Sequence, residues 1–335
     1  MKHTIFQALA KAARNRQSVA LGIITSVKGS SPQKTGAKAL FYPDGNIVGT
    51  LGGGCLEAEI RQRALAALRT GQPAMVDMVL DNEFGWDDGL ICGGHVQGII
   101  IPNAQNAGAT LWEQLATRNT PKTWGVKNDF SIALANSIVK QLNGIPPTSW
   151  LYLETITPPC ALWIAGSGHI ARAVAPLALQ LDFAVTIFDD RPDMANHNHF
   201  PTEVTINTGD WSALCAMPFP DAPVFGLIVT RGHKHDSLVL ESWIHRPFAF
   251  LGMIGSARKA RTIFDHFVNK GIATPAQLTQ VACPVGINIH AQTVPEIAVS
   301  IMAQFIAKRA ELTKHPHAKL PLNSKPGSPA DAAAS

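Results

Sequence analysis

The stretch ALWIAGSGHIA, at residues 161–171, decides the fold of the second half of the chain. Its first five residues are apolar and predict a buried strand, and its glycine turn leads into an apolar helical pattern over residues 170–181. A second strand-like run, at residues 184–188, ends at Asp189. Strand, Gly-X-Gly-X-X-Ala, helix, strand and acid follow one another as in a dinucleotide-binding fingerprint. The sequence therefore predicts a Rossmann-like domain.

The small residues of this fingerprint have separate physical roles. Gly166 permits the tight turn after the strand, and Gly168 lets a phosphate group approach the start of the helix. Ala171 lets the helix pack closely on the strand, and Asp189 stands where a ribose-binding carboxylate belongs. A Rossmann-like fold does not by itself establish that a dinucleotide is bound.

Strand-like and helical patterns continue to alternate after Asp189. Apolar strands are predicted at residues 224–229 and 248–254, and each is followed by a polar loop and a helix. The carboxyl ends of parallel strands face the ligand crevice, so His233 after the first of these strands, and Ser256 with Arg258 after the second, are candidate binding residues. The alternative is that these positions only cap or solvate the helices that follow.

A second glycine-rich stretch, GTLGGGCLE at residues 49–57, lies in the first half of the chain. It follows short strand-like runs and leads into an amphipathic helical pattern over residues 56–69, with Gly71 as the stop. Cys55 is therefore expected where a glycine loop meets a helix N-terminus, a position that favours bound anions and the thiolate form of cysteine. Glu57 opposes the second effect. The alternative is a glycine turn with a cysteine packed in the core.

Two further loops of the first half carry candidate side chains. Ser30 and Ser31, with lysines shortly after them, are able to hold a phosphate through backbone N–H groups and ammonium charge, although an ordinary solvated loop has the same composition. Short turns between the strands are expected to place this loop and the Cys55 loop at the same end of a small sheet. Cys92 and His95 lie between two apolar runs. Together they are candidates for a pair of metal ligands or for a thiol activated by the imidazole, but two ligands do not make a structural zinc site.

Composition limits the class of protein. The chain has 335 residues, of which 46% are hydrophobic and 16% charged, as in globular proteins with a substantial core. Its net charge of +4 argues against bulk nucleic-acid binding, and no apolar run has the length of a membrane span. The N-terminus lacks the apolar core of a signal peptide. Five scattered cysteines without a Cys-X-X-Cys pair suit a reducing cytoplasm.

These patterns predict an α/β protein, with a small N-terminal α/β domain followed by a Rossmann-like parallel-sheet domain. We expect the first domain over residues 1–102 and a connector over residues 103–149, with helical patterns at residues 110–116 and 132–142. The Rossmann-like domain is expected over residues 150–312. The tail, residues 313–335, is rich in Pro, Lys, Ser and Ala and is expected to be disordered.

Motifs of both halves resemble the xanthine dehydrogenase accessory proteins of the XdhC/CoxI type. In the first half the resemblance rests on Gly29-Ser30-Ser31-Pro32, Gly52-Gly53-Gly54-Cys55-Leu56-Glu57 and Cys92-Gly93-Gly94. In the second half it rests on Gly166-Ser167-Gly168-His169, Asp189-Asp190-Arg191-Pro192, Thr230-Arg231-Gly232-His233, Gly255-Ser256-Ala257-Arg258-Lys259 and Glu296-Ile297-Ala298-Val299-Ser300-Ile301. Where the family usually has Gly-Leu-Asp-Ile-Gly, this chain has Gly286-Ile287-Asn288-Ile289-His290, so the acid is missing.

The resemblance implies a cytoplasmic, homodimeric maturation factor and not an enzyme with catalytic residues of its own. Such proteins bind molybdenum cofactor (molybdopterin), protect it while a cysteine desulfurase supplies its terminal sulfur, and aid its insertion into a molybdenum hydroxylase such as xanthine dehydrogenase. Cys55 would contact the metal, because thiolates ligate thiophilic metals. The implied cofactor-binding residues are Ser30, Ser31, Gly52, Gly53, Gly54, Cys55, Cys92, Gly166, Gly168, His169, Asp189, His233, Ser256 and Arg258.

Two other functions remain compatible with the residues. An NAD-dependent oxidoreductase would use the Rossmann-like half, with His233 or His235 as acid–base. A regulatory protein would bind a nucleotide in the same half only to sense it. Nicotinamide turnover separates the first alternative from a maturation factor, and tight nucleotide binding without turnover indicates the second.

Overall fold

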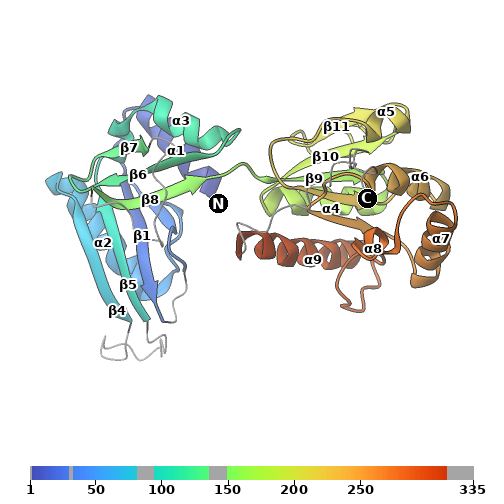
Figure 1. Cartoon of the computed structure of the whole chain (residues 1–335). Helices are drawn as coiled ribbons and strands as arrows, with labels where there is room; N and C mark the ends of the chain where they lie inside the picture. The colour runs from blue at the N-terminus through green and yellow to red at the C-terminus, as the bar shows by residue number, and fades with distance from the viewer. Residues whose placement is uncertain (1, 30–32, 81–93, 136–148, 315–335) are drawn as a thin grey trace, which may run out of the picture. The chain divides into compact units, whose positions relative to one another are not determined.

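The computed structural model describes residues 2–29, 33–80, 94–135 and 149–314. The chain forms two compact units, Met1–Pro158 and Pro159–Ser335, and each is described by itself (Figure 1). Most of the expected tail, from residue 315 onward, lies outside the described residues. Within the described ranges, no helix combines the length and apolar character needed to cross a bilayer.

The first unit is built on a five-stranded antiparallel sheet with the strand order β3-β2-β1-β5-β4. Its strands are β1 (Ala20–Lys28), β2 (Lys38–Phe41), β3 (Ile47–Gly49), β4 (Ala74–Leu80) and β5 (Gly94–Ile101). One face packs against α2 (Gly54–Thr70), which buries Leu56, Ile60 and Ala64 at helical spacing. The other face packs against α1 (Lys2–Arg14) and α3 (Ala109–Thr117), with the short 3-10 helix η1 (Ala104–Ala107) beside them.

Residues expected to form a connector belong to the first unit. Helix α3 forms as expected, but the helix expected over residues 132–142 is wrong in its first part, where β7 (Ile132–Ala135) pairs with β6 (Lys122–Lys127). The expected domain boundary also moves, because β8 (Trp150–Ile156) completes this second sheet in the order β7-β6-β8. Phe6, Trp112 and Trp124 form a buried aromatic cluster with ring centroids 5.5–6.1 Å apart. Burial of these rings holds the connector against α1.

The second unit is a parallel sheet between two layers of helices. Its six strands lie in the order β11-β10-β9-β12-β13-β14. They are β9 (Cys160–Ala165), β10 (Phe183–Asp189), β11 (Thr205–Thr208), β12 (Val224–Ile228), β13 (Phe250–Met253) and β14 (Val281–Ala282). Neighbouring strands are parallel throughout. The expected Rossmann-like fold is therefore confirmed.

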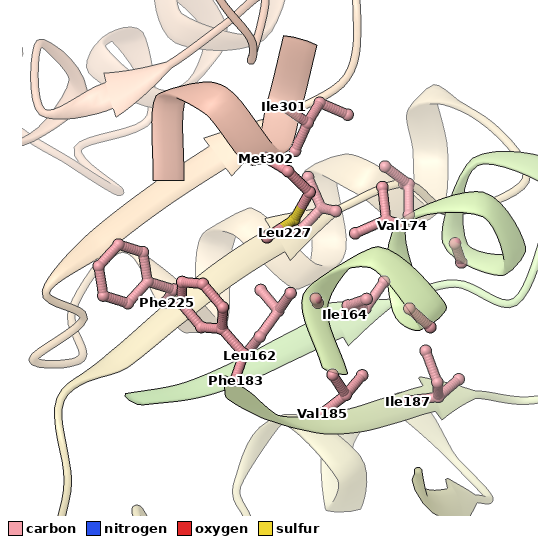
Figure 2. Close-up of a cluster of buried hydrophobic side chains, with 14 of the residues drawn as sticks. Leu162, Ile164, Val174, Phe183, Val185, Ile187, Phe225, Leu227, Ile301 and Met302 are labelled. Carbon is pink, nitrogen blue, oxygen red and sulfur yellow. The ribbon is translucent and has the colours of Figure 1, made fainter. Parts of the chain in front are cut away.

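The two helical layers bury opposite faces of this sheet. Leu162 and Ile164 of β9 pack with α4 (His169–Gln180) and α9 (Val294–Lys314), as Figure 2 shows. Trp163 of the same strand points to the other face, covered by α5 (Trp211–Cys215), α6 (His233–Trp243), α7 (Ala257–Asn269) and α8 (Pro275–Leu278). Strand β9 lies between β10 and β12, so the direction of winding reverses beside it. Ligands of such folds bind at the carboxyl ends of the strands at this point.

The loop before α9 shows where this chain departs from the family motif. His290 adopts a φ of 56°, in the left-handed region that favours glycine, and the family usually has glycine there. The Asn288 side chain accepts a hydrogen bond of 3.1 Å from the His290 N–H. Asn288 therefore has a local structural role in this turn.

Candidate functional site

The glycine loop and the serine loop of the first unit leave its sheet at the same edge. Strands β1 and β3 are both antiparallel to β2, so their carboxyl ends point the same way. Gly29 and Thr50, the first residues after these strands, therefore both leave the sheet at that edge, as expected. Strand β5 begins at this edge too, with His95 opposite Lys28. Ser30, Ser31 and Cys92 lie outside the described residues.

Cys55 stands in the first turn of α2, as expected, because this helix begins at Gly54. Gly52 and Gly53 have φ values of 118° and 73°, which only glycine adopts without strain. Gly53 is the N-cap and provides no side-chain cap. A Cβ added at Gly53 would meet nothing within 4 Å, so the approach to the helix start is open there. Such a helix start offers N–H groups and the positive end of the helix dipole to an anion.

Glu57 holds the glycine loop in shape. Its Oε2 accepts hydrogen bonds from the Thr50 hydroxyl at 2.7 Å and from the Leu51 N–H at 2.9 Å. Partial burial works to raise the pKa of Glu57, but hydrogen bonds from Leu51, Thr50 and Gly53 outweigh it and hold the pKa below its ordinary value. The carboxylate thus braces the loop that carries Cys55.

Lys38 has a structural role that the sequence did not indicate. Its side chain is buried, and Nζ donates to Gly36 O at 2.8 Å, to the Tyr152 hydroxyl at 3.2 Å and to Glu154 Oε2 at 2.5 Å. The ammonium group therefore links Tyr152 and Glu154 of β8 to Gly36. Because it is buried, it is not accessible to a phosphate in solvent. The neighbouring lysine, Lys34, is exposed.

His95 lies on the sheet with a carboxylate as its partner. Its Nε2 contacts Asp77 Oδ1, and Gln97 Nε2 donates to Asp77 Oδ2 at 3.0 Å. These hydrogen bonds, the one to His95 first, lower the pKa of Asp77. The expected pairing of His95 with Cys92 involves a residue outside the described ranges.

In the second unit, the fingerprint glycines lie at the reversal point of the sheet. Gly166 has a φ of 113°, and a Cβ there would come within 2.3 Å of Val229 O. The loops after β9 and β12 are therefore in backbone contact. Gly168 has a φ of −73° as the N-cap of α4, and a Cβ there would meet nothing within 4 Å. The path to the start of α4, where His169 is exposed, is open.

Asp189 is fully engaged inside the protein. It is 1% exposed. Its Oδ2 accepts from the Ser167 N–H at 2.8 Å and from the Ser167 hydroxyl at 2.7 Å. The Arg191 guanidinium donates to both oxygens, at 2.9 Å each. The geometry does not support the expected ribose-binding role, because these donors occupy the oxygens that a ribose diol would need.

We expect Asp189→Asn to destabilise the second unit. Burial works to raise the pKa of Asp189, but hydrogen bonds from Arg191 and Ser167 lower it from 3.8 to about 2. A shift of this size corresponds to about 2 kcal/mol of unfolding free energy. Because the folded-state pKa is the lower one, this stabilisation is present at neutral pH and is lost as pH falls from about 4 to about 2.

Urea unfolding of the wild type and Asp189→Asn between neutral and acid pH tests this expectation. The difference between the two proteins should be largest at neutral pH and should shrink as Asp189 of the wild type is protonated. Asp265→Asn removes an exposed carboxylate of α7 and serves as the control. A difference that stays constant down to acid pH would contradict the assignment.

A second buried carboxylate joins the loops after β12 and β13. Asp236 is 1% exposed, and its Oδ1 accepts from the Thr230 N–H at 3.0 Å and the Thr230 hydroxyl at 2.6 Å. Its Oδ2 accepts from Lys259 Nζ, which also donates to Ile254 O at 3.2 Å. Ser256 caps α7 by accepting from the Lys259 N–H at 3.2 Å. Ser256 therefore has a capping role at the start of α7.

The remaining candidates of the second unit lie at the same edge of the sheet. His233 and Arg258 are exposed in the first turns of α6 and α7. Sequence reasoning missed the ion pair between Arg231 and Asp190, which have an N–O distance of 2.7 Å. Their positions were the available signal, because Asp190 follows β10 directly, Arg231 lies three residues after β12, and these strands flank β9.

Two thiols of the second unit, those of Cys215 and Cys283, have raised pKa values. Burial raises the pKa of Cys215 to about 11. Burial also raises the pKa of Cys283, against a smaller opposite effect of Lys259. Both thiols are therefore protonated at neutral pH. Among the residues whose side chains are described, no three His, Cys, Asp or Glu gather as a metal site.

Two family models match this chain in the two units just described. The model for the XdhC and CoxI family matches residues 12–79, which include the Cys55 loop. The XdhC Rossmann domain matches residues 162–305, which include the loops at the carboxyl ends of β9, β10 and β12. The chain belongs to the XdhC/CoxI family. The family resemblance expected from the motifs is confirmed.

Relatives of this XdhC/CoxI family member extend over nearly the whole chain. A Bacillus subtilis protein, named as a probable subunit of xanthine dehydrogenase, is 25% identical to it over 92% of this chain and 97% of that protein. The chain is also 25% identical to the uncharacterized protein YqeB of Escherichia coli, over 90% of this chain, but spans only 46% of the length of YqeB. A crystal structure described as a xanthine dehydrogenase from Bacillus halodurans covers 95% of this chain and is itself covered to 98%, with a TM-score of 0.77 and 23% identity. This last likeness shows the fold.

Proposed function

We propose that this XdhC/CoxI family member binds molybdenum cofactor as cargo and delivers it to a molybdenum hydroxylase such as xanthine dehydrogenase. The observation that carries the proposal is the start of α2, where an open glycine loop, braced by Glu57, leads directly to Cys55. Membership of the family supports the choice of client, as does the Bacillus subtilis relative whose name links it to xanthine dehydrogenase.

The residues present fit such a cargo. The cofactor brings a phosphate group and a molybdenum atom with sulfur and oxygen ligands. Amide groups at an uncapped helix start suit the phosphate, and a thiolate at the same place suits a thiophilic metal. Gly52 and Gly53 keep side chains away from the loop, and Cys55 is the proposed metal-contacting residue. In this role the chain binds and shields its cargo and needs no catalytic residues of its own.

The remaining parts of the proposal concern partners. We expect a cytoplasmic homodimer that holds the cofactor while a cysteine desulfurase supplies the terminal sulfur. The client then receives the sulfurated cofactor. These expectations rest on the family resemblance.

Reconstitution of a client tests the function. Wild-type protein loaded with molybdenum cofactor should raise the active fraction of cofactor-free xanthine dehydrogenase in proportion to the cofactor delivered, because a carrier acts stoichiometrically. The measurement is xanthine oxidation against moles of loaded carrier, with unloaded carrier as the control. Many-fold turnover of a small substrate by the isolated chain, or no gain over free cofactor, would contradict the proposal.

A further inference from the structure

Rossmann folds bind ligands in a crevice at the carboxyl ends of their strands, which here are those of β9, β10 and β12, and the usual ribose anchor there is already engaged. In a Rossmann fold the acid at the end of the second strand binds the ribose hydroxyls of a dinucleotide. Here that acid is Asp189, and Ser167 and Arg191 occupy its oxygens at distances of 2.7–2.9 Å. With an exposure of 1%, the carboxylate has no surface to offer a ligand. The fingerprint is therefore present, but its carboxylate is not available to the ribose of a dinucleotide.

The carboxyl-end edge of the sheet also carries a partly exposed ion pair between Arg231 and Asp190. Arg231 follows β12 and Asp190 follows β10, so their ion pair joins the loops on the two sides of β9. The side chains are 43% and 25% exposed. An ion pair with this exposure contributes little free energy, so an incoming anion competes with it readily. Asp190 retains a second cationic neighbour when released, because Arg191 Nε lies 3.9 Å from its Oδ1.

A histidine ring nitrogen provides a second acceptor for Arg231. His235 Nε2 lies 3.2 Å from the Arg231 guanidinium. A guanidinium has only donors, so Nε2 is the acceptor in this contact. Arg231 is thus held between a carboxylate and an imidazole nitrogen, both of which are acceptors. A phosphate oxygen is an acceptor of the same kind, and the planar guanidinium pairs with phosphate as well as with carboxylate.

We propose that Arg231 binds the phosphate group of a phosphomonoester in the crevice of the second unit, in place of Asp190, and that this crevice does not take NAD(P) through its ribose. In the absence of ligand, the Asp190 carboxylate pairs with Arg231 where the phosphate would bind. The proposal does not depend on the proposed function, which places the phosphate of the cargo at the start of α2. It also assigns the crevice a different ligand from the NAD-dependent alternative.

Titration with inorganic phosphate and with NAD⁺ tests the proposal by calorimetry. Wild-type protein should bind phosphate weakly but saturably and should show no saturable binding of NAD⁺. Arg231→Ala should lose most of the phosphate affinity, and Arg231→Lys should keep part of it, because the charge remains without the planar donors. Asp190→Asn should bind phosphate about two- to fivefold more tightly, because an exposed ion pair no longer competes.

A matched control separates site binding from general charge. Lys308→Ala removes a cation that is 42% exposed and paired with Glu311 on α9, far along the chain from the crevice loops. Its phosphate affinity should equal that of the wild type. Unchanged phosphate binding in folded Arg231→Ala, or an equal loss in Lys308→Ala, would overturn the proposal, as would saturable NAD⁺ binding. Arg231→Lys and Asp190→Asn keep the test decisive if Arg231→Ala does not fold.

The outcome is distinct from that of the reconstitution assay. Loss of phosphate binding in Arg231→Ala supports the inference whether or not wild-type protein activates xanthine dehydrogenase. Failure of wild-type protein to activate xanthine dehydrogenase contradicts the proposed function and leaves the phosphate result in place.

Discussion

Gly166→Ala is expected to prevent the second unit from folding stably, whereas Gly168→Ala is expected to fold like the wild type. At Gly166 a Cβ would come within 2.3 Å of Val229 O and 2.7 Å of Val229 C, which are backbone atoms of the neighbouring loop. The φ of 113° adds strain for any other residue. Steric overlap and backbone strain together should lower the unfolding free energy by about 3–5 kcal/mol.

Gly168 is the matched position in the same loop. Its φ of −73° suits any residue, and a Cβ there would meet nothing within 4 Å. Thermal and urea unfolding of the two alanine variants should therefore differ by several kcal/mol although the chemical change is the same. Equal stabilities would contradict the close approach of the loops after β9 and β12.

The larger variant Gly168→Val should fold and should still reduce ligand binding, because its side chain occupies the path to the start of α4. A folded Gly168→Val protein with wild-type affinity for phosphate and for molybdenum cofactor would remove this loop from the site.

Cys55→Ser is expected to abolish most of the cofactor retention while leaving the melting temperature near that of the wild type. The substitution nearly preserves volume but replaces a soft, ionisable sulfur with a hard oxygen that binds molybdenum poorly. Cys55 lies in the first turn of α2, and helix N-termini in general favour the thiolate, which is the metal-binding form. We expect at least about a tenfold loss in retained molybdenum, equivalent to about 1.4 kcal/mol or more of binding free energy.

Cys92→Ser is the comparison variant for this experiment. Cys92 is preceded and followed by apolar runs and not by a helical pattern, so no helix dipole is expected to lower its pKa. Its substitution should cost less retention. Each folded variant is loaded with molybdenum cofactor, desalted and assayed for bound molybdenum and pterin. Equal retention in wild type and Cys55→Ser would exclude Cys55 from the site, and a larger loss in Cys92→Ser would assign the metal contact to Cys92.

Local patterns predicted the two glycine loops and the elements around them. The three glycines before Cys55 and the apolar spacing of Leu56, Ile60 and Ala64 are properties of neighbouring residues, and α2 begins and ends within two residues of the expected positions. Thr293 and Glu296 at the start of α9 have the spacing of a capping box, which is likewise a local pattern. Glu296 Oε2 accepts from the Thr293 N–H at 3.0 Å, as its spacing predicts.

Pairing partners decided the elements that sequence reasoning misassigned. The alanines and the leucine at residues 132–135 suit a helix, but hydrogen bonding to β6 draws them into β7. Trp150–Ile156 has the pattern of a strand wherever it pairs, and only its contacts with β6 place it in the first unit.

The sequence by itself determined that the second half is a Rossmann-like domain, because a strand, a glycine turn, a helix and an acid act over short distances along the chain. The tertiary structure alone decided what Asp189 does. Ser167 and Arg191 donate hydrogen bonds to its two oxygens. The fingerprint motif does not specify whether the carboxylate accepts from the protein or from a ligand. The tertiary structure likewise decided that Arg231 meets Asp190, because residues 41 positions apart become neighbours only when β10 and β12 close around β9.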